Sequence, residues 1–182
     1  MGPPGAGKGT QGALLAQAFG LPKFATGDLL RDAVKRGTPL GRQANAIMEA
    51  GHLVSDDIIL GVIRDELAKP EAERGVIFDG VVRTVPQAEG MARILAEKGR
   101  RMDAVLFFDV SDEEILARLG RRRSLEHRAD DDPAAVATRL RAYREQTAPL
   151  LAWYEARQPV RRIPAVGTVE EIAGRVRQAL GR

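Results

Sequence analysis

The stretch that most constrains this 182-residue chain lies at its beginning, where GPPGAGKGT occupies residues 2–10. Glycines at this density allow backbone N–H groups to turn inward and approach a phosphate chain that side chains would block. Lys8 supplies an ammonium for the β- and γ-phosphates, and Thr10 supplies a hydroxyl suited to Mg²⁺ or phosphate. The periodic apolar residues that follow, Leu15 and Phe19 among them, predict a helix whose positive N-terminus points at the same anion. The stretch therefore predicts a P-loop.

This P-loop departs from the usual pattern in two places. The pattern has Ser or Thr directly after the lysine, whereas Gly9 stands between Lys8 and Thr10. A P-loop also normally follows a buried parallel strand, and only Met1 precedes Gly2 in this sequence. We therefore expect either that the chain is a truncation or redesign, or that another segment supports the loop. A glycine-rich linker is disfavoured, because linkers rarely place Gly-Lys-Gly-Thr at a helix start.

Composition restricts the class of protein further. A hydrophobic content of 44% over 182 residues suits one compact α/β domain, and no run of about 18 apolar residues predicts a membrane span. The sequence has no cysteine, which excludes cysteine-ligated zinc and fits a reducing cytosol. The formal charge is only +3 and aromatic residues make up 4%, too few for stacking on bases. Small phosphorylated molecules therefore explain the arginines better than nucleic acid does.

Expected strands and helices alternate along the chain. We predict strands at 21–25, 76–78, 104–110 and 160–163. We predict helices after the P-loop, at 26–35, from Pro39 to Gly51, from Asp56 to Pro70, at 86–98, from 112 onward, at 133–157 with a kink at Pro149, and at 169–180. Three successive helices without a strand predict a small helical lobe. The alternation itself predicts an α/β fold with a doubly wound parallel sheet, in which ligands bind beyond the carboxyl ends of the strands.

Candidate functional residues follow those strand ends. Asp79 comes directly after a buried apolar strand, where P-loop enzymes keep the carboxylate that orients Mg²⁺. Taken alone, Asp79-Gly80 would be interpreted as a turn. A planar guanidinium binds phosphate oxygens bidentately, so several arginines together suit a site that neutralises several phosphates, although a solvated helix face explains any single one better. The arginines in question are Arg31, Arg83, Arg118, Arg122, Arg128 and Arg139.

The order of motifs resembles the adenylate kinase family of P-loop nucleoside monophosphate kinases, in its bacterial short-lid form. The motifs are GPPGAGKGT, TGDLLRDAV, GHLVSDDII, FDGVVRT with PQAE, RADD and RLRAYREQTAPL, and together they extend over nearly the whole chain. The resemblance implies the reaction ATP + AMP ⇌ 2 ADP, by in-line phosphoryl transfer without a covalent intermediate and with Mg²⁺ as cofactor. It also implies one kinase domain over residues 1–182, with an AMP-binding lobe at 25–54 and a lid at 121–130. This lid is too short to hold a structural zinc ion.

The same resemblance implies roles for individual residues. ATP would be bound by Gly5, Ala6, Gly7, Lys8, Gly9, Thr10, Arg118, Arg122 and Gly167. AMP would be bound by Thr26, Arg31, His52, Leu53, Val54, Gly80, Arg83, Gln87, Arg128 and Arg139, with Gln87 reading the adenine edge. The catalytic cations would be Lys8, Arg83, Arg122, Arg128 and Arg139. Thr10 and Asp79 would hold Mg²⁺, in part through water.

Partners and alternatives follow from this resemblance as well. It implies a cytoplasmic monomer that binds ATP, AMP and ADP and neither nucleic acid nor a membrane. The family has Phe-Pro where this chain has Val81-Val82, and the loss of proline frees the backbone that aims Arg83. Two other hypotheses stay open: a kinase for another nucleoside monophosphate, against which Thr26 and Gln87 argue, and a nucleotide-binding protein with little activity.

Overall fold

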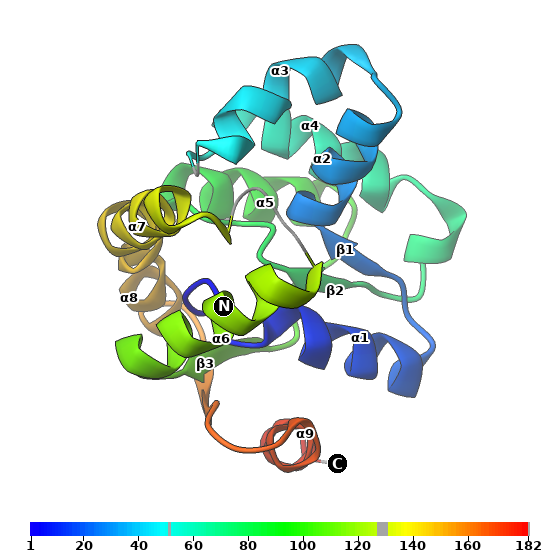
Figure 1. Ribbon diagram of the computed structural model, residues 1–182. Helices are drawn as coiled ribbons and strands as arrows, with labels where there is room; N and C mark the ends of the chain where they lie inside the picture. The colour runs from blue at the N-terminus through cyan, green and yellow to red at the C-terminus, as the bar shows by residue number, and fades with distance from the viewer. Residues whose placement is uncertain (51, 127–130, 182) are drawn as a thin grey trace.

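Parallel strands alternate with helices in the computed structural model, which describes residues 1–50, 52–126 and 131–181 (Figure 1). The strands are β1 (Lys23–Ala25), β2 (Ile77–Asp79), β3 (Val105–Asp109) and β4 (Val160–Pro164). The helices are α1 (Lys8–Phe19), α2 (Thr26–Lys35), α3 (Pro39–Glu49), α4 (Asp56–Leu67), α5 (Val85–Glu97), α6 (Asp112–Glu126), α7 (Pro133–Ala142), α8 (Pro149–Glu155) and α9 (Val169–Ala179). The structure also has a 3₁₀ turn at Pro70–Ala72 and a π-helical turn at Tyr143–Thr147. The mixed α/β class predicted from the sequence is confirmed.

The strands form two parallel pairs instead of one continuous hydrogen-bonded sheet. β1 pairs with β2, with Phe24 opposite Phe78, and β3 pairs with β4, with Phe107 opposite Arg162. Within the described part of the chain no ladder of hydrogen bonds joins β2 to β3. The predicted doubly wound sheet is therefore present as two halves, each with its strands parallel.

Met1 and Gly2 lie between these halves. The backbone nitrogen of Met1 donates a hydrogen bond to the Leu106 carbonyl, and the Phe108 N–H donates to the Met1 carbonyl at 2.9 Å. This is the pattern of a parallel bridge opposite Phe107. An apolar cavity of about 150 Å³, lined in part by Phe78 of β2 and Leu106 of β3, lies beside Met1 and Gly2. Met1, held against β3, therefore anchors the start of the P-loop.

Helices cover both faces of the strands, as a doubly wound fold requires. Phe108 of β3 belongs to an apolar cluster that includes side chains of α1 and α9. Val105, three residues earlier and on the opposite face, packs with side chains of α5 and α8. A larger cluster joins the α2–α5 region to β1 and β2. No helix among the described residues is long and apolar enough to cross a membrane.

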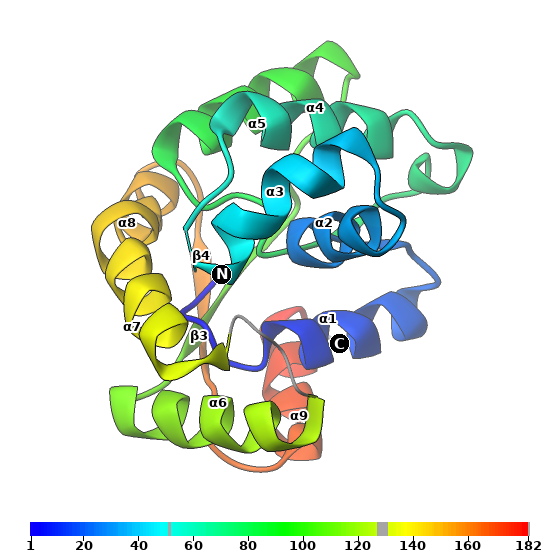
Figure 2. The same ribbon diagram turned by 45° about the horizontal axis from the view of Figure 1, so that its top comes forward.

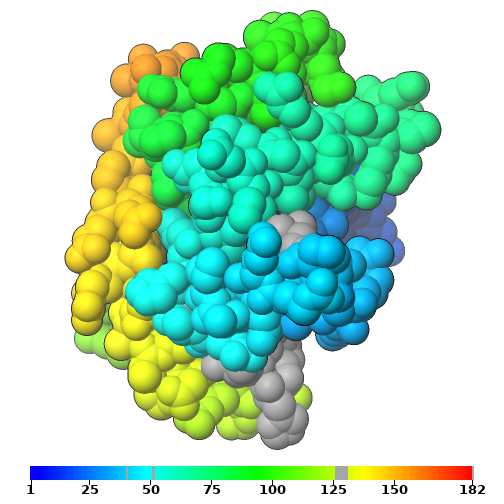
Figure 3. All heavy atoms as spheres, turned by 90° about the horizontal axis from the view of Figure 1, so that it is seen from above, coloured from blue at the N-terminus to red at the C-terminus, as the bar shows by residue number. Residues whose placement is uncertain are grey.

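The three successive helices predicted after β1 are α2, α3 and α4, and they stand to one side of the strands (Figure 1). Thr38 caps α3 as expected, since its hydroxyl accepts a hydrogen bond from the Gly41 N–H at 3.0 Å, with Pro39 at the first helical position. A Cβ at Gly41 would lie 2.1 Å from the Ala33 carbonyl oxygen, so glycine permits α3 to cross closely over α2. Seen from above, α3 lies between α2 and α7 (Figure 3). The terminator predicted at Gly51 lies outside the described residues.

The helix predicted from 133 to 157 with a kink at Pro149 is interrupted immediately before that proline. The Ala148 N–H donates to the Tyr143 carbonyl at 2.7 Å, a five-residue π-type spacing, and α8 begins at Pro149. Proline lacks an N–H and crowds the preceding turn, which accounts for the local widening. Figure 2 shows α7 and α8 following one another along one side of the molecule.

Of the predicted lid, residues 121–126 end α6 and residues 127–130 are not described.

Candidate active site

The P-loop turns tightly from Met1 into α1. Gly2 has a φ of 136°, and a Cβ there would lie 2.7 Å from the Phe108 carbonyl oxygen, so only glycine fits against β3. Gly7 precedes α1 with a φ of 84°, and α1 begins at Lys8. The first N–H groups of α1 have no partners within the helix and point out of its N-terminus. The loop thus ends in an anion site formed by backbone and helix dipole together.

Lys8 reaches back over its own loop. Its Nζ donates to the carbonyls of Gly2 at 2.8 Å and Pro3 at 2.7 Å. Burial lowers the pKa of its ammonium to about 7, and the Asp79 carboxylate opposes this shift. The positive charges of three neighbouring guanidinium groups lower the pKa further. An anion in the pocket would replace the carbonyls as the acceptor and restore the charge.

A pocket of about 790 Å³ opens in front of this loop. It brings together almost every site residue predicted from the sequence. Its lining includes Gly5, Ala6, Gly7, Lys8, Gly9, Thr10, Thr26, Arg31, His52, Leu53, Val54, Asp79, Gly80, Arg83, Gln87, Arg118, Arg122 and Arg139. Among the predicted residues that the structure describes, Gly167 does not line it, and Arg128 lies outside the described residues.

Two of the pocket arginines share one carboxylate. Asp131 has a fully buried side chain, and its Oδ2 accepts from Arg122 Nε at 2.6 Å while Oδ1 accepts from Arg122 Nη2. Arg139 Nη1 donates to the same Oδ1 at 3.0 Å. Charge-assisted pairs of this kind fix a guanidinium in both position and plane. Asp131 therefore fixes a cation from α6 and a cation from α7 beside the P-loop.

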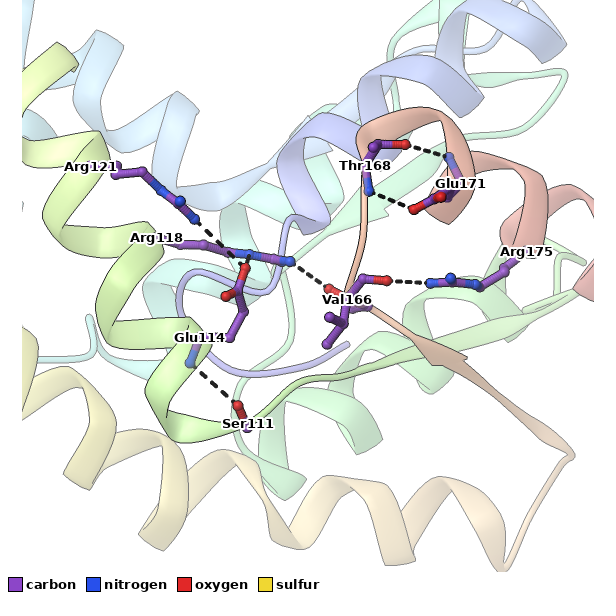
Figure 4. Close-up of polar contacts among 9 residues, drawn as sticks. Ser111, Glu114, Arg118, Arg121, Val166, Thr168, Glu171 and Arg175 are labelled. Carbon is purple, nitrogen blue, oxygen red and sulfur yellow. Dashed lines mark hydrogen bonds and ion pairs between the residues drawn. The ribbon is translucent and has the colours of Figure 1, made fainter.

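Arg118 is held in a different way, across the gap between α6 and the segment before α9 (Figure 4). Its Nε donates to Glu114 Oε1 at 2.6 Å, and its Nη2 donates to the Ala165 carbonyl at 2.7 Å. α9 starts with the predicted capping box: the Thr168 hydroxyl accepts from the Glu171 N–H, and Glu171 accepts from the Thr168 N–H. Arg118 therefore ties α6 to the segment that contains Gly167.

Oxygen ligands suited to magnesium lie beside the start of α1. Asp79 ends β2, its side chain is 13% exposed, and Lys23 Nζ lies 3.6 Å from Oδ2. A Cβ at Gly9 would lie 3.4 Å from the same oxygen, which places the carboxylate against the first turn of α1 near Thr10. Mg²⁺ prefers a few protein oxygens together with phosphate oxygens and water, so Asp79 and the Thr10 hydroxyl fit that ion. No cluster of three or more metal-ligating side chains occurs in the described part of the chain.

The wall on the lobe side carries neutral polar groups beside the cations Arg31 and Arg83. Thr26, at the start of α2, donates to the Gly80 carbonyl at 3.2 Å, and Arg83 Nε donates to the same carbonyl at 3.1 Å. Gln87 is only 1% exposed, and its Oε1 accepts from the Arg83 backbone N–H at 2.7 Å. Gln87 Nε2 donates to Asp56 Oδ1 at 2.7 Å. The amide predicted to read a base is therefore already fixed by protein partners.

Sequence reasoning did not assign roles to Asp131 and Asp56. Asp131 belongs to the RADD segment, which contributed to the resemblance, but nothing local indicates that its carboxylate is buried between two arginines. Asp56 begins the helix predicted from Asp56 to Pro70, and an acidic residue in the first turn of α4 already has a local explanation there. The contacts of Asp56 with Gln87 and of Asp131 with Arg122 and Arg139 join residues that lie on different helices or helix ends. They form only when the chain folds, so the structure is needed to identify them.

Known proteins are similar in sequence to this chain over nearly its whole length. Residues 1–159 match the sequence model of the family described as adenylate kinase. An adenylate kinase of Thermus thermophilus is 52% identical over 181 residues, covering 100% of this chain and 95% of that protein. The adenylate kinases of Gemmatimonas aurantiaca and Xanthomonas oryzae pv. oryzae are 46% and 43% identical, with 99% and 100% of this chain and 96% and 97% of those proteins covered. The chain belongs to the adenylate kinase family.

Proposed function

We propose that the large pocket is the active site at which this family member transfers the γ-phosphoryl group of ATP to AMP. The observation that carries the proposal is the position of Lys8, at the start of α1 in a pocket that Arg122 and Arg139 also line. Phosphoryl transfer requires mainly positioning and charge stabilisation, and no covalent group on the protein. A set of cations at a P-loop meets that requirement.

ATP binds on the P-loop side in this proposal. The backbone N–H groups of residues 5–10 and the N-terminus of α1 bind its phosphates, with Lys8 at the β- and γ-phosphates. Arg118 lies beside the ATP base, and Gly167 contacts that base through its backbone. The support for Gly167 is indirect: the Arg118 side chain contacts Ala165, two residues before it.

AMP binds on the lobe side. Its base is read by Gln87, with Thr26 and residues 52–54 around it, while cations bind its phosphate. These groups are Arg31, Arg83 and Arg128, together with Arg139 from the P-loop side, and Gly80 lies at the turn before Arg83. The support is that all of them except Arg128, which is not described, line the same pocket.

The transfer step joins the two sides. An AMP phosphate oxygen attacks the γ-phosphorus of ATP in line with the bond to the leaving ADP oxygen, so that bond breaks as the new one forms. Lys8, Arg83, Arg122, Arg128 and Arg139 stabilise the charge on the transferring group. Closure of the lid at 121–130 and movement of the lobe at 25–54 exclude water, which would otherwise compete as the acceptor.

Magnesium has a place in the same arrangement. The Thr10 hydroxyl and, through water, the Asp79 carboxylate would hold the ion that accompanies ATP. When bound, it neutralises phosphate charge. Lys23 contacts Asp79 and keeps that carboxylate close to α1.

The decisive experiment is a coupled assay of ADP formation with ATP and each of AMP, GMP, CMP and UMP. Turnover that depends on AMP and exceeds turnover with the other acceptors supports the proposal. Turnover with another monophosphate in preference to AMP would reassign the acceptor. ATP binding by titration without turnover on any acceptor would support the nucleotide-binding alternative instead.

We also propose that the protein acts as a cytoplasmic monomer. The support is that one chain supplies every wall of the described pocket, so no second copy is needed to complete it. Light scattering during size-exclusion chromatography at assay concentration tests the monomeric state, and fractionation of the cells that produce the protein tests its location. A dimer mass that persists on dilution would contradict it.

A further inference from the structure

Asp56, the first residue of α4, connects that helix to the start of α5. Its Oδ1 accepts two hydrogen bonds, from the Thr84 hydroxyl at 3.0 Å and from Gln87 Nε2 at 2.7 Å. Thr84 is the N-cap of α5, and its hydroxyl accepts in turn from the Gln87 N–H. On the other side of the amide, the Arg83 backbone N–H donates to Gln87 Oε1 at 2.7 Å. Gln87 is therefore enclosed by partners from two helix starts.

These partners permit one orientation of the Gln87 amide. A carboxylate can only accept hydrogen bonds, and a backbone N–H can only donate. Exchanging Oε1 and Nε2 would place an oxygen against the Asp56 carboxylate and an NH₂ group against the Arg83 N–H. In a site as buried as this, each such mismatch is costly. The side chain therefore presents its donor and acceptor in a fixed order.

A fixed order matters because Gln87 lines the large pocket. Nε2 keeps a second hydrogen and Oε1 keeps a second lone pair, so the amide can still make one donor and one acceptor contact. A 6-amino purine carries a donor on its 6-substituent beside an acceptor at N1. A 6-oxo purine carries the reverse, an acceptor beside a donor. One amide orientation therefore complements one class of purine and opposes the other.

We propose that Asp56 is a specificity-determining positioning residue, which fixes the Gln87 amide so that the monophosphate site selects 6-amino over 6-oxo purines. The inference rests on the proposed function, because it assumes that the lobe side of the pocket binds the acceptor nucleotide. Asp56 does not itself line the pocket and acts through Gln87.

The test compares kcat/KM for AMP with kcat/KM for IMP, two substrates that differ only at this edge of the base. Asp56→Asn preserves volume but removes the charge and adds a group that can donate, so one of the two partners that oppose the exchanged amide orientation is lost and only the Arg83 N–H remains. We expect the AMP-to-IMP ratio to fall about tenfold, as for loss of one hydrogen bond to a charged acceptor. Asp57→Asn is the matched control, since Asp57 is exposed and carries the same charge on the same first turn of α4.

A double-mutant cycle shows whether Asp56 acts through Gln87. In a Gln87→Leu background, adding Asp56→Asn should leave the AMP-to-IMP ratio unchanged, because no amide remains to be oriented. The inference is overturned if Asp56→Asn lowers kcat/KM for AMP and IMP by the same factor, which would mean that Asp56 only tethers α4 to α5. It is also overturned if Asp57→Asn changes the ratio as much.

The proposed function can fail separately. If the unmodified chain forms no ADP from AMP and ATP, the kinase proposal fails, and titration of AMP and IMP in the absence of ATP then tests Asp56 alone. A preference for AMP in that titration that Asp56→Asn abolishes would uphold the assignment. Equal preferences in the two proteins would refute it.

Discussion

The two sides of the pocket hold their functional groups by different chemistry. On the P-loop side the groups are cations, and their partners are carbonyls or carboxylates: Gly2 and Pro3 for Lys8, and Asp131 for Arg122 and Arg139. On the lobe side the central group is a neutral amide, held between a carboxylate and a backbone N–H. Both sides are thus ordered before any nucleotide binds.

The difference predicts what each side controls. A cation interacts with charge that develops in the transition state, so losing or misplacing it should lower the rate with every acceptor. An amide of fixed orientation distinguishes hydrogen-bond patterns, so disturbing it should change the preference between acceptors. Variants on the two sides should therefore separate into effects on kcat and effects on selectivity.

The largest expected effect is on the P-loop side. Lys8→Met should lower kcat by about 10³-fold or more, because it removes a preorganised cation at the transferring phosphate. The fold should persist, since α1 begins at this position whichever side chain stands there. Steady-state assays with circular dichroism of the same samples test this.

Lys35→Met provides the control for loss of one positive charge, because Lys35 is exposed at the end of α2 and does not line the pocket. It should leave kcat within about twofold of the unmodified value. Near-normal turnover in Lys8→Met would remove the P-loop assignment.

The second test disturbs the partner and leaves the cations in place. Asp131→Asn should lower kcat by about 10- to 100-fold, because Arg122 and Arg139 lose the charge that fixes them and small misplacements are costly. It should also lower the free energy of unfolding by on the order of 3 kcal/mol, since two arginines lose a buried counter-charge. The AMP-to-IMP ratio should stay constant, in contrast to the effect of Asp56→Asn.

Asp132→Asn is the matched variant one residue away. Asp132 is exposed, lies 3.5 Å from Arg123 and caps α7, and asparagine caps helices as well as aspartate does. Its kcat and unfolding midpoint should hardly change. If both substitutions reduce kcat equally, Asp131 has no special role at the cations.

The third test uses pH. Because the pKa of Lys8 falls from 10.5 in the unfolded chain to about 7 in the folded one, the unfolded chain binds more protons between these values. The contribution of Lys8 to the free energy of unfolding therefore rises with pH across this window, by up to about 1.4 kcal/mol per pH unit. Urea unfolding at intervals from pH 6.5 to pH 9 should show this rise.

Lys8→Met should abolish that part of the pH dependence. In addition, ATP binding at pH 8 should take up protons in the unmodified chain, because the phosphates restore the charge of Lys8. Titration in buffers of different ionisation enthalpy measures the uptake. Equal uptake in Lys8→Met would mean that the protons bind elsewhere.

The sequence predicted more of the site than of the sheet. The residues of the P-loop, the three-helix lobe and most of the arginines reach one pocket, because each follows a local signal such as a glycine-rich turn or a strand end. The division of the strands into two pairs does not follow from the alternation of strands and helices along the sequence. Strand pairing depends on contacts between distant segments, whereas caps such as Thr38 and Thr168 depend on neighbours within four residues.

The residues that the sequence did not reveal are those that hold the pocket side chains in place, and not those that line the pocket. Asp131 and Asp56 are ordinary acidic residues in the sequence, and an acidic residue at a helix start already has a local explanation. Their roles arise because the fold brings specific donors to them, the Arg122 and Arg139 guanidinium groups to Asp131 and the Thr84 hydroxyl and Gln87 amide to Asp56. Sequence reasoning can therefore name groups that would meet a nucleotide but not the groups that hold them.

The smallest expected effect concerns the turn between β2 and α5, where the two sides meet. Val81 is buried and Val82 lines the small apolar cavity, while the next residue, Arg83, bonds to Gly80 and Gln87. Proline fixes φ and reduces the freedom of the unbound turn, an effect of about 0.4–1 kcal/mol where the backbone accepts it. Replacing Val81 and Val82 by Phe and Pro should therefore lower KM for AMP by about two- to fivefold and change KM for ATP less. Because the positive charge of Arg83 acts on Lys8 and the Arg83 backbone N–H donates to Gln87, the double variant also tests whether the two sides are independent. An unchanged KM for AMP would mean that Gly80 and Gln87 already fix Arg83 without proline, and a larger change in KM for ATP would mean that the turn acts on the P-loop side first.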